Sequence, residues 1–115
     1  MASTFKVKTS RSVGTTPTAV GGYTVASATQ TTIIGLAVAN VLTGSLSASQ
    51  IIIEAAINDG VNDTYIIKNA QVPGGSSIVL VGGDQKIVLE TGYSVKVTSD
   101  TASSADVILS ILELT

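Results

Sequence analysis

The side chains with the most suggestive spacing for chemistry lie in the segment NDGVND, from Asn58 to Asp63. Asp59 and Asp63, with the amide oxygens of Asn58 and Asn62, are the oxygen ligands that Ca²⁺ prefers. The segment lacks the loop spacing and the closing glutamate of an EF-hand. Asn, Asp and Gly are also the residues that a tight turn between two strands requires. The pattern therefore predicts a turn, with Asp59 and Asp63 as the metal candidate.

Catalysis is harder to build because the chain has no histidine and no cysteine. Histidine is the commonest general base and the commonest metal ligand in proteins. Without cysteine there is neither a disulfide framework nor a thiolate zinc site. The carboxylates Glu54 and Glu90 could form a glycosidase-like pair, but nothing in the sequence brings them together. We therefore expect a protein that is not an enzyme and that needs no cofactor.

Three glycine pairs could be taken for phosphate-binding loops. They are Gly21-Gly22, Gly74-Gly75 and Gly82-Gly83. None of them lies between an expected strand and an expected helix, and no Lys-Ser or Lys-Thr follows in the manner of a Walker motif. Glycine supplies the left-handed backbone that tight turns need. These pairs therefore predict turns.

Nucleic acid and membranes are poor partners for this chain. Its net charge is −2, and its four aromatic residues are too scattered for a base-stacking platform: Phe5, Tyr23, Tyr65 and Tyr93. The longest apolar stretch, Ile33–Leu42, is too short to span a bilayer and contains Asn40. No secretory signal is recognisable near the start. We expect a soluble, unanchored protein that binds no nucleic acid.

Charge is distributed unevenly along the chain. Lys6, Lys8 and Arg11 give +3, and from Glu54 onward eight acidic residues and three lysines give −5, which sums to −2. No charged residue occurs between Ser12 and Ile53. A solvated sheet normally carries Lys or Glu at its edges. Two interpretations stay open: neighbouring subunits cover this stretch, or its many Thr and Ser residues solvate it.

Apolar residues recur with period two along most of the chain, which is typical of strands. The segment Thr32–Val41 is expected to place Ile34, Leu36 and Val38 on one face. The segment Gln50–Ile57 is expected to point four apolar residues inward: Ile51, Ile53, Ala55 and Ile57. Both strand faces are largely apolar in the last strand, VILSILEL, which predicts a central strand covered on both sides.

Turn signals every eight to twelve residues or so separate these segments, as in all-β sandwiches. The sequence therefore predicts one antiparallel β-sandwich or jelly roll of about eight or nine strands. Residues 1–18 are expected to form a polar N-terminal arm, and residues 19–115 the β-sandwich domain.

The second half of the chain resembles a group of small virion proteins of tailed bacteriophages. The resemblance is carried by a strand ending in VANV, the turn Val-Pro-Gly-Gly at Val72–Gly75, the hairpin IVLETGYSVKV at Ile87–Val97 and the closing strand ILSILEL. It covers roughly Thr31 to Leu114. These are turn and core features, so they indicate a fold more specifically than a role, and no catalytic residues are carried over.

The resemblance implies a small β-sandwich attached to the phage particle. The leading hypothesis is a capsid decoration (cement) protein that binds the outer face of the major capsid protein lattice and stabilises the shell. Such a protein would be made in the bacterial host cytoplasm and end on the virion surface. The alternatives are a tail, baseplate or fibre-attachment component, and a carbohydrate-binding or adhesive sandwich.

The same hypothesis predicts how the protein associates. We expect self-association as a homotrimer or a similar cluster. The arm is expected to contact an acidic partner surface and to add a strand to it, through Phe5, Lys6, Lys8 and Arg11. Deletion of Met1–Arg11 is then expected to abolish capsid attachment without unfolding the domain.

Overall fold

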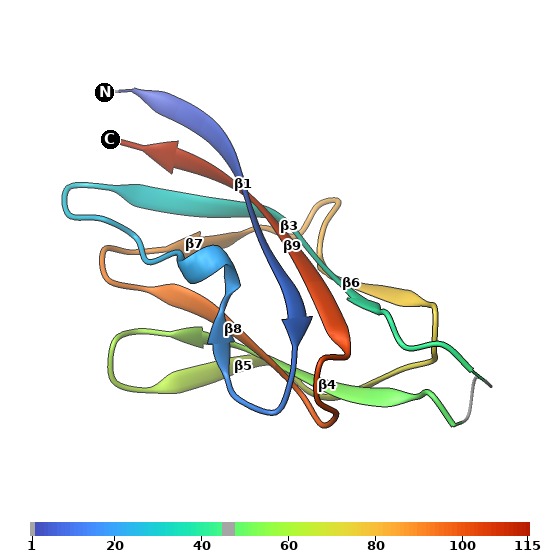
Figure 1. Ribbon diagram of the computed structural model, residues 1–115. Coiled ribbons are helices and arrows are strands. Elements are labelled where there is room, and N and C mark those ends of the chain that lie inside the picture. The colour runs from blue at the N-terminus through green and yellow to red at the C-terminus, as the bar shows by residue number, and fades with distance from the viewer. Residues whose placement is uncertain (1, 45–47) are drawn as a thin grey trace.

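Two antiparallel sheets pack face to face in the computed structural model, which describes residues 2–44 and 48–115 (Figure 1). One sheet has the strand order β1-β9-β3-β6, with β7 also paired to β3, and the other has the order β2-β8-β4-β5. We call them the first and the second sheet. The sandwich predicted from the sequence is confirmed.

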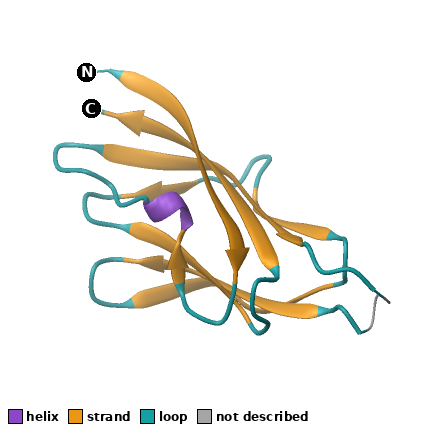
Figure 2. Cartoon of the chain, in the orientation of Figure 1, coloured by secondary structure: helices purple, strands orange, loops and turns teal. Residues whose placement is uncertain are grey.

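Nine strands and one short 3₁₀ turn, η1, make up the regular structure of the described residues (Figure 2). The first sheet contains β1 (Ser3–Val13), β3 (Gln30–Asn40), β6 (Ser77–Val81), β7 (Ile87–Leu89) and β9 (Ala105–Leu114). The second sheet contains β2 (Thr18–Ala19), β4 (Ile51–Asn58), β5 (Asp63–Val72) and β8 (Ser94–Ser99), while η1 spans Val20–Gly22. Among these residues, no helix has the length and apolar character needed to cross a membrane.

The core lies between the two sheets and is almost entirely aliphatic. Its largest fully buried side chains include Ile33, Leu36, Ile51, Ile53, Leu89, Leu109 and Ile111. Successive side chains of a strand point to opposite faces, so the period-two pattern supplies one apolar face per strand. This explains why β4, β8 and β9 form where the sequence predicts strands.

Of the expected arm over residues 1–18, the stretch Ser3–Val13 is strand β1 of the first sheet instead. β1 runs antiparallel to β9 in continuous register from Ser3 opposite Leu114 to Ser10 opposite Val107. A bulge follows, and Val13 then lies opposite Ala105 and is buried. The alternation of Phe5 and Val7 with lysines, which looks polar as a sequence, gives the strand one apolar face.

Two predictions about strand faces are wrong. A bulge in β3 between Ile33 and Gly35 shifts the alternation, so that Ile33 and not Ile34 shares the inner face with Leu36. β9 is central, as expected, but only one of its faces is covered, and Ile108 on the other is 52% exposed. A bulge adds one residue to one strand, which reverses the facing of everything before it.

The Val-Pro-Gly-Gly turn after β5 is held by a close approach of two loops. Ser76 donates its backbone N–H to Pro73 O at 3.0 Å, and Gly75 donates to Asn40 O at 3.1 Å. A Cβ on Gly74 would lie 2.5 Å from the Cβ of Ser49, so only glycine fits there. The turn predicted from sequence is confirmed, with a packing reason beyond its conformation.

Candidate functional site

The outer face of the first sheet exposes several large apolar side chains. Register places Phe5, Leu112, Thr32 and Val88 side by side across β1, β9, β3 and β7. A second row across β1, β9, β3 and β6 consists of Thr9, Ile108, Ala37 and Val79. Between them lies a central row that consists of Val7, Ser110 and Gly35.

Five of these residues expose large apolar side chains: Phe5 75%, Val7 60%, Val79 68%, Val88 60% and Ile108 52%. We call the three rows, with the half-buried Ile34 beside the central one, the uncharged face. None of its residues is charged; Arg11 and Asp106 lie at one end of it. Large apolar side chains exposed together on one sheet face are typical of contact surfaces.

The outer face of the second sheet is different in character. Glu54 and Lys68 form an ion pair at 3.4 Å, and Lys68 Nζ lies 3.9 Å from the centre of the Tyr65 ring. The Tyr65 hydroxyl, followed by Glu54, raises the pKa of Lys68. A shallow hollow of about 280 Å³ is lined there by Ile52, Glu54, Asn69, Thr98, Ser99 and Asp100. This polar face needs no cover, so the two outer faces are unequal.

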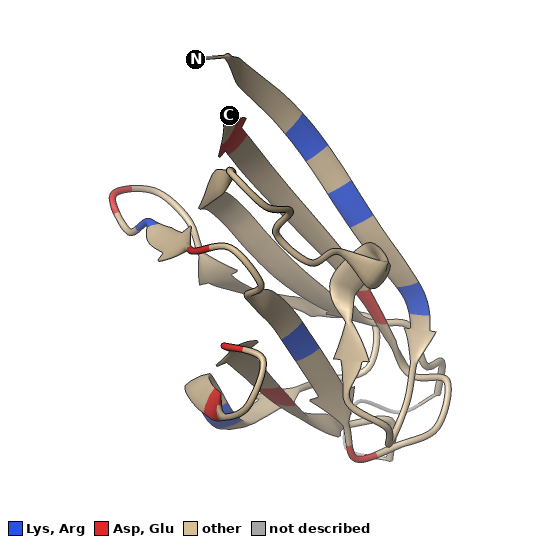
Figure 3. Cartoon of the chain, turned by 90° about the vertical axis from the view of Figure 1, so that its left-hand side faces the viewer, with Lys and Arg blue, Asp and Glu red and all other residues tan. Residues whose placement is uncertain are grey.

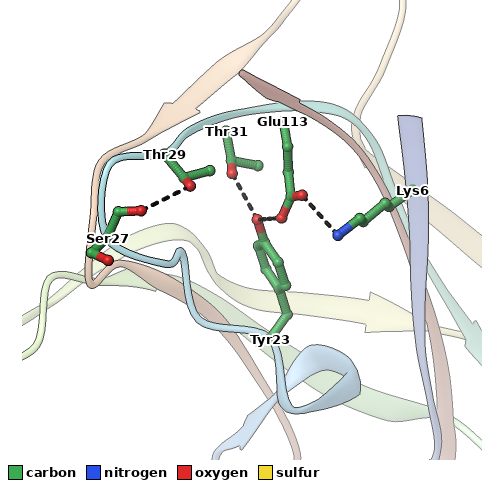
Figure 4. A network of polar contacts seen from close by, with 6 residues as sticks. All are labelled: Lys6, Tyr23, Ser27, Thr29, Thr31 and Glu113. Carbon is green, nitrogen blue, oxygen red and sulfur yellow. Dashed lines mark hydrogen bonds and ion pairs between the residues drawn. The ribbon is translucent and has the colours of Figure 1, made fainter. Parts of the chain in front are cut away.

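A buried carboxylate on the inner side of β9 gathers polar groups from three elements (Figure 4). The Tyr23 hydroxyl donates to Glu113 Oε2 at 2.6 Å and lies 2.7 Å from Thr31 Oγ1. Lys6 Nζ lies 2.8 Å from Glu113 Oε1. The network ties β1, β3 and β9 to the segment that follows η1.

The electrostatics of this network follow from its contacts. Hydrogen bonds from Lys6 and then from Tyr23 lower the pKa of the Glu113 carboxyl. Burial, and next the hydrogen bond to Glu113, raise the pKa of Tyr23 to about 12. Glu113 is therefore ionised and Tyr23 neutral at neutral pH. The network is structural: it connects the strands, and each of its buried polar side-chain atoms has a hydrogen-bond partner.

The four residues expected to bind a partner as one arm do not lie together: they point to different sides of β1. Basic residues follow β1 along the sheet edge (Figure 3). Lys6 is held by Glu113, and Lys8 Nζ lies 5.5 Å from the centre of the Tyr23 ring, so both serve the fold. Phe5 points the other way, onto the uncharged face, and Arg11 is exposed at the end of the strand.

The metal candidate is a hairpin turn. Asp59 Oδ1 accepts the N–H groups of Val61 at 2.9 Å and Asn62 at 2.7 Å. These bonds lower the pKa of Asp59, the one from Asn62 most. Asn58 accepts from Gly60 and donates to Asp63 Oδ1 at 2.7 Å. Among the described residues no three acidic side chains group as metal ligands, and turn chemistry accounts for Asp59 and Asp63.

The remaining carboxylates that could have formed a catalytic pair have separate partners. Glu54 pairs with Lys68 on β5. Glu90 lies beside Tyr93, and its charge is the main cause of the raised pKa of that hydroxyl. Each of the two carboxylates therefore has a different neighbour: Lys68 for Glu54 and Tyr93 for Glu90.

Sequence reasoning did not predict three features: the role of Glu113, the role of Asn40 and the uncharged face. Glu113 in the apolar closing strand was a visible signal for a buried partner, as was Asn40 inside an apolar stretch. Asn40 Nδ2 donates to Ser49 O at 2.6 Å and to Val72 O at 2.8 Å, and its Oδ1 accepts from Leu42 N at 2.9 Å. The signal for the uncharged face was that both strand faces of VILSILEL are largely apolar.

No protein-family model matches the chain, and no curated protein matches it significantly. Among solved structures, a chain of Bacillus endospore appendages, described as disulfide-linked pili, superposes with a TM-score of 0.53 at 14% identity, covering 99% of this chain and 87% of that chain. A chain of the virus-like particle of the extra small virus of the prawn Macrobrachium rosenbergii superposes at 0.50 and 12% identity, covering 97% and 77%. The chain thus has a β-sandwich fold similar to those two proteins.

Proposed function

We propose that this chain is a non-enzymatic structural protein of a virus particle, and specifically a decoration protein on the capsid of a tailed bacteriophage. The uncharged face carries the proposal. A protein that works alone in solution seldom exposes five large apolar side chains on one sheet face. A subunit of an assembly buries such a face against its neighbours.

One expectation from the sequence and one comparison support this role. The second half of the chain resembles phage virion proteins in its turns and strands. The two solved structures of similar fold come from assembled objects, a pilus and a virus-like particle. These 115 residues contain no cysteine, so they cannot form disulfide links like those described for the pili.

The mechanism is linkage between binding and assembly. A protein that binds the closed lattice of the major capsid protein, and not the free subunits, shifts the equilibrium towards the closed shell. No bond is made or broken, so the protein needs neither a cofactor nor a catalytic residue.

The edge of β1 offers a contact that fits this role. Ala2 and Thr115 exchange two backbone hydrogen bonds, of 3.0 and 2.9 Å. By antiparallel alternation, the N–H and C=O groups of Ser3, Phe5 and Val7 then point away from β9. A strand of the shell protein can pair with this edge by β-augmentation. In this proposal the edge of β1, and not a free arm, pairs with a strand of the partner.

A tail, baseplate or fibre-attachment component is the second candidate, since it too would cover an apolar face and use a free edge. Location on the particle separates the two. Gold-labelled antibody against the purified chain should mark the capsids of the phage that encodes it. Label confined to tails would favour the second candidate, and particles without label would refute both.

Binding can be tested on capsids stripped of the protein. The purified chain should cosediment with stripped shells to saturation and raise the temperature at which they open. If shells and protein sediment separately at all concentrations tested, the capsid role is wrong.

A further inference from the structure

We propose that the uncharged face is covered by the same face of a second copy of this chain. The inference rests on the proposed function in one respect, namely that the face is a contact surface of an assembly. It goes further by naming the occupant and the symmetry of the contact.

Charge is the first argument for a second copy. When two identical faces pack together, a charged residue of one copy can lie close to the same charge on the other copy and be repelled. The three rows of the uncharged face contain no Lys, Arg, Asp or Glu. The face therefore meets itself without repulsion and without burying an unpaired ion, which would be costly in an apolar contact.

Size is the second argument. The three rows span five residues of β9, Ile108 to Leu112, so at about 3.4 Å per residue the uncharged face is about 17 Å long. Four strands lie side by side across it, which at about 4.8 Å each gives a width of about 19 Å. The three rows thus cover about 320 Å², less than half of the ~800 Å² that each partner buries in a standard interface. One copy is enough to cover it.

Relief is the third argument. The central row is low at Ser110 and Gly35, and on β9 the larger side chains of Leu112 and Ile108 stand on either side of Ser110. Phe5 projects on one side and Ile108 on the other. Two twisted sheets pack face to face at about 30° with interleaved side chains, and rows of unequal height suit this geometry.

A contact of a face with itself has two-fold symmetry, so the product is a dimer. This differs from the homotrimer expected from the sequence, because a trimer needs two different surfaces in contact. In the dimer the β1 edges stay free, and each can still pair with a strand of a shell protein.

The test is the solution mass of the wild-type chain and three variants by light scattering across a dilution series. Ile108→Asp and Val79→Asp place a carboxylate on the uncharged face. Val61→Asp is the matched control, because Val61 is 85% exposed in the β4–β5 turn. Circular dichroism establishes that each variant is folded. Val79 lies on the short edge strand β6, so its variant keeps the test valid if Ile108→Asp unfolds.

The wild type and Val61→Asp should have the mass of two chains. Both face variants should have the mass of one chain, with the dissociation constant raised at least about 100-fold, because each copy brings an unpaired carboxylate into apolar contact. A monomeric wild type at every concentration, a trimer, or a control that dissociates as readily as the face variants would each overturn the inference. A monomer that still binds shells would leave the proposed function standing.

Discussion

Lys6 Nζ lies 2.8 Å from Glu113 Oε1, and this ion pair fastens the edge strand β1 to the inner face of β9. Among the described residues, Glu113 is the only charged one that is buried. Its second oxygen accepts the Tyr23 hydroxyl, so the carboxylate is partnered on both sides. The segment that looks like a free basic arm is therefore part of the folded domain.

Acid should weaken the protein through Glu113. Its bonds to Lys6 and Tyr23 hold its pKa below the value of an unfolded glutamate, about 4.3. The contribution is complete above that pH and is lost as the pH falls through the lower, folded pKa. Urea unfolding at stepped pH should show this decline in the wild type. Glu113→Gln should be less stable at pH 7 and show a shallower decline; an unchanged slope would contradict the assignment.

Alkali should weaken the protein through Tyr23. Its pKa is raised to about 12, whereas that of an unfolded tyrosine is about 10. The folded state therefore keeps a proton that the unfolded state loses, and stability falls as the pH rises from about 10 to about 12. Tyr23→Phe should flatten this alkaline limb and cost about 1–2 kcal/mol at pH 7.

Tyr65→Phe is the control for that measurement, because Tyr65 is 45% exposed on the other sheet. It should change the free energy of unfolding by less than about 0.5 kcal/mol. If the two variants behave alike, the polar network around Glu113 does not stabilise the fold as described.

Asn40 should be intolerant of a change that keeps its shape. Asn40→Asp replaces the amide nitrogen that donates to Ser49 O and Val72 O with an oxygen that repels both carbonyls. We expect a loss of about 2–4 kcal/mol in the free energy of unfolding, measured in urea. Asn69→Asp, at an exposed position of β5, should stay within about 0.5 kcal/mol of the wild type. Equal losses in both would contradict the role of Asn40.

Deletion of Met1–Arg11 should destabilise the domain, contrary to the expectation for an arm. It removes most of β1, leaves Glu113 without Lys6, and makes the central strand β9 an unprotected edge. We expect a loss of several kcal/mol, or aggregation, seen as a lower melting temperature and reduced solubility. A deletion variant that melts like the wild type would show that β1 is dispensable.

The sequence predicts most of the fold, because the signals for strands and turns are local. NDGVND, Val-Pro-Gly-Gly and Gly82-Gly83 each lie where the structure has a turn between strands. The hairpin of β4 and β5 follows from the turn between two alternating segments, and the central place of β9 follows from its two largely apolar faces. Such features depend on residues close together in the chain.

Features that depend on distant residues could not be predicted. The bulge before Gly35 is set by pairing with β9, more than 70 positions further on, and it decides that Ile33 and not Ile34 is buried. The place of β1 depends on that same strand at the other end of the chain. The uncharged face depends on which of the two apolar faces of β9 packs against the core.

The number of copies per particle tests the central claim most directly. Quantitative mass spectrometry of purified phage, referenced to the major capsid protein, measures it without assumptions about contacts. A capsid decoration protein is expected in hundreds of copies per particle. A dozen copies or fewer would indicate the tail, and absence from purified particles would contradict the structural role itself.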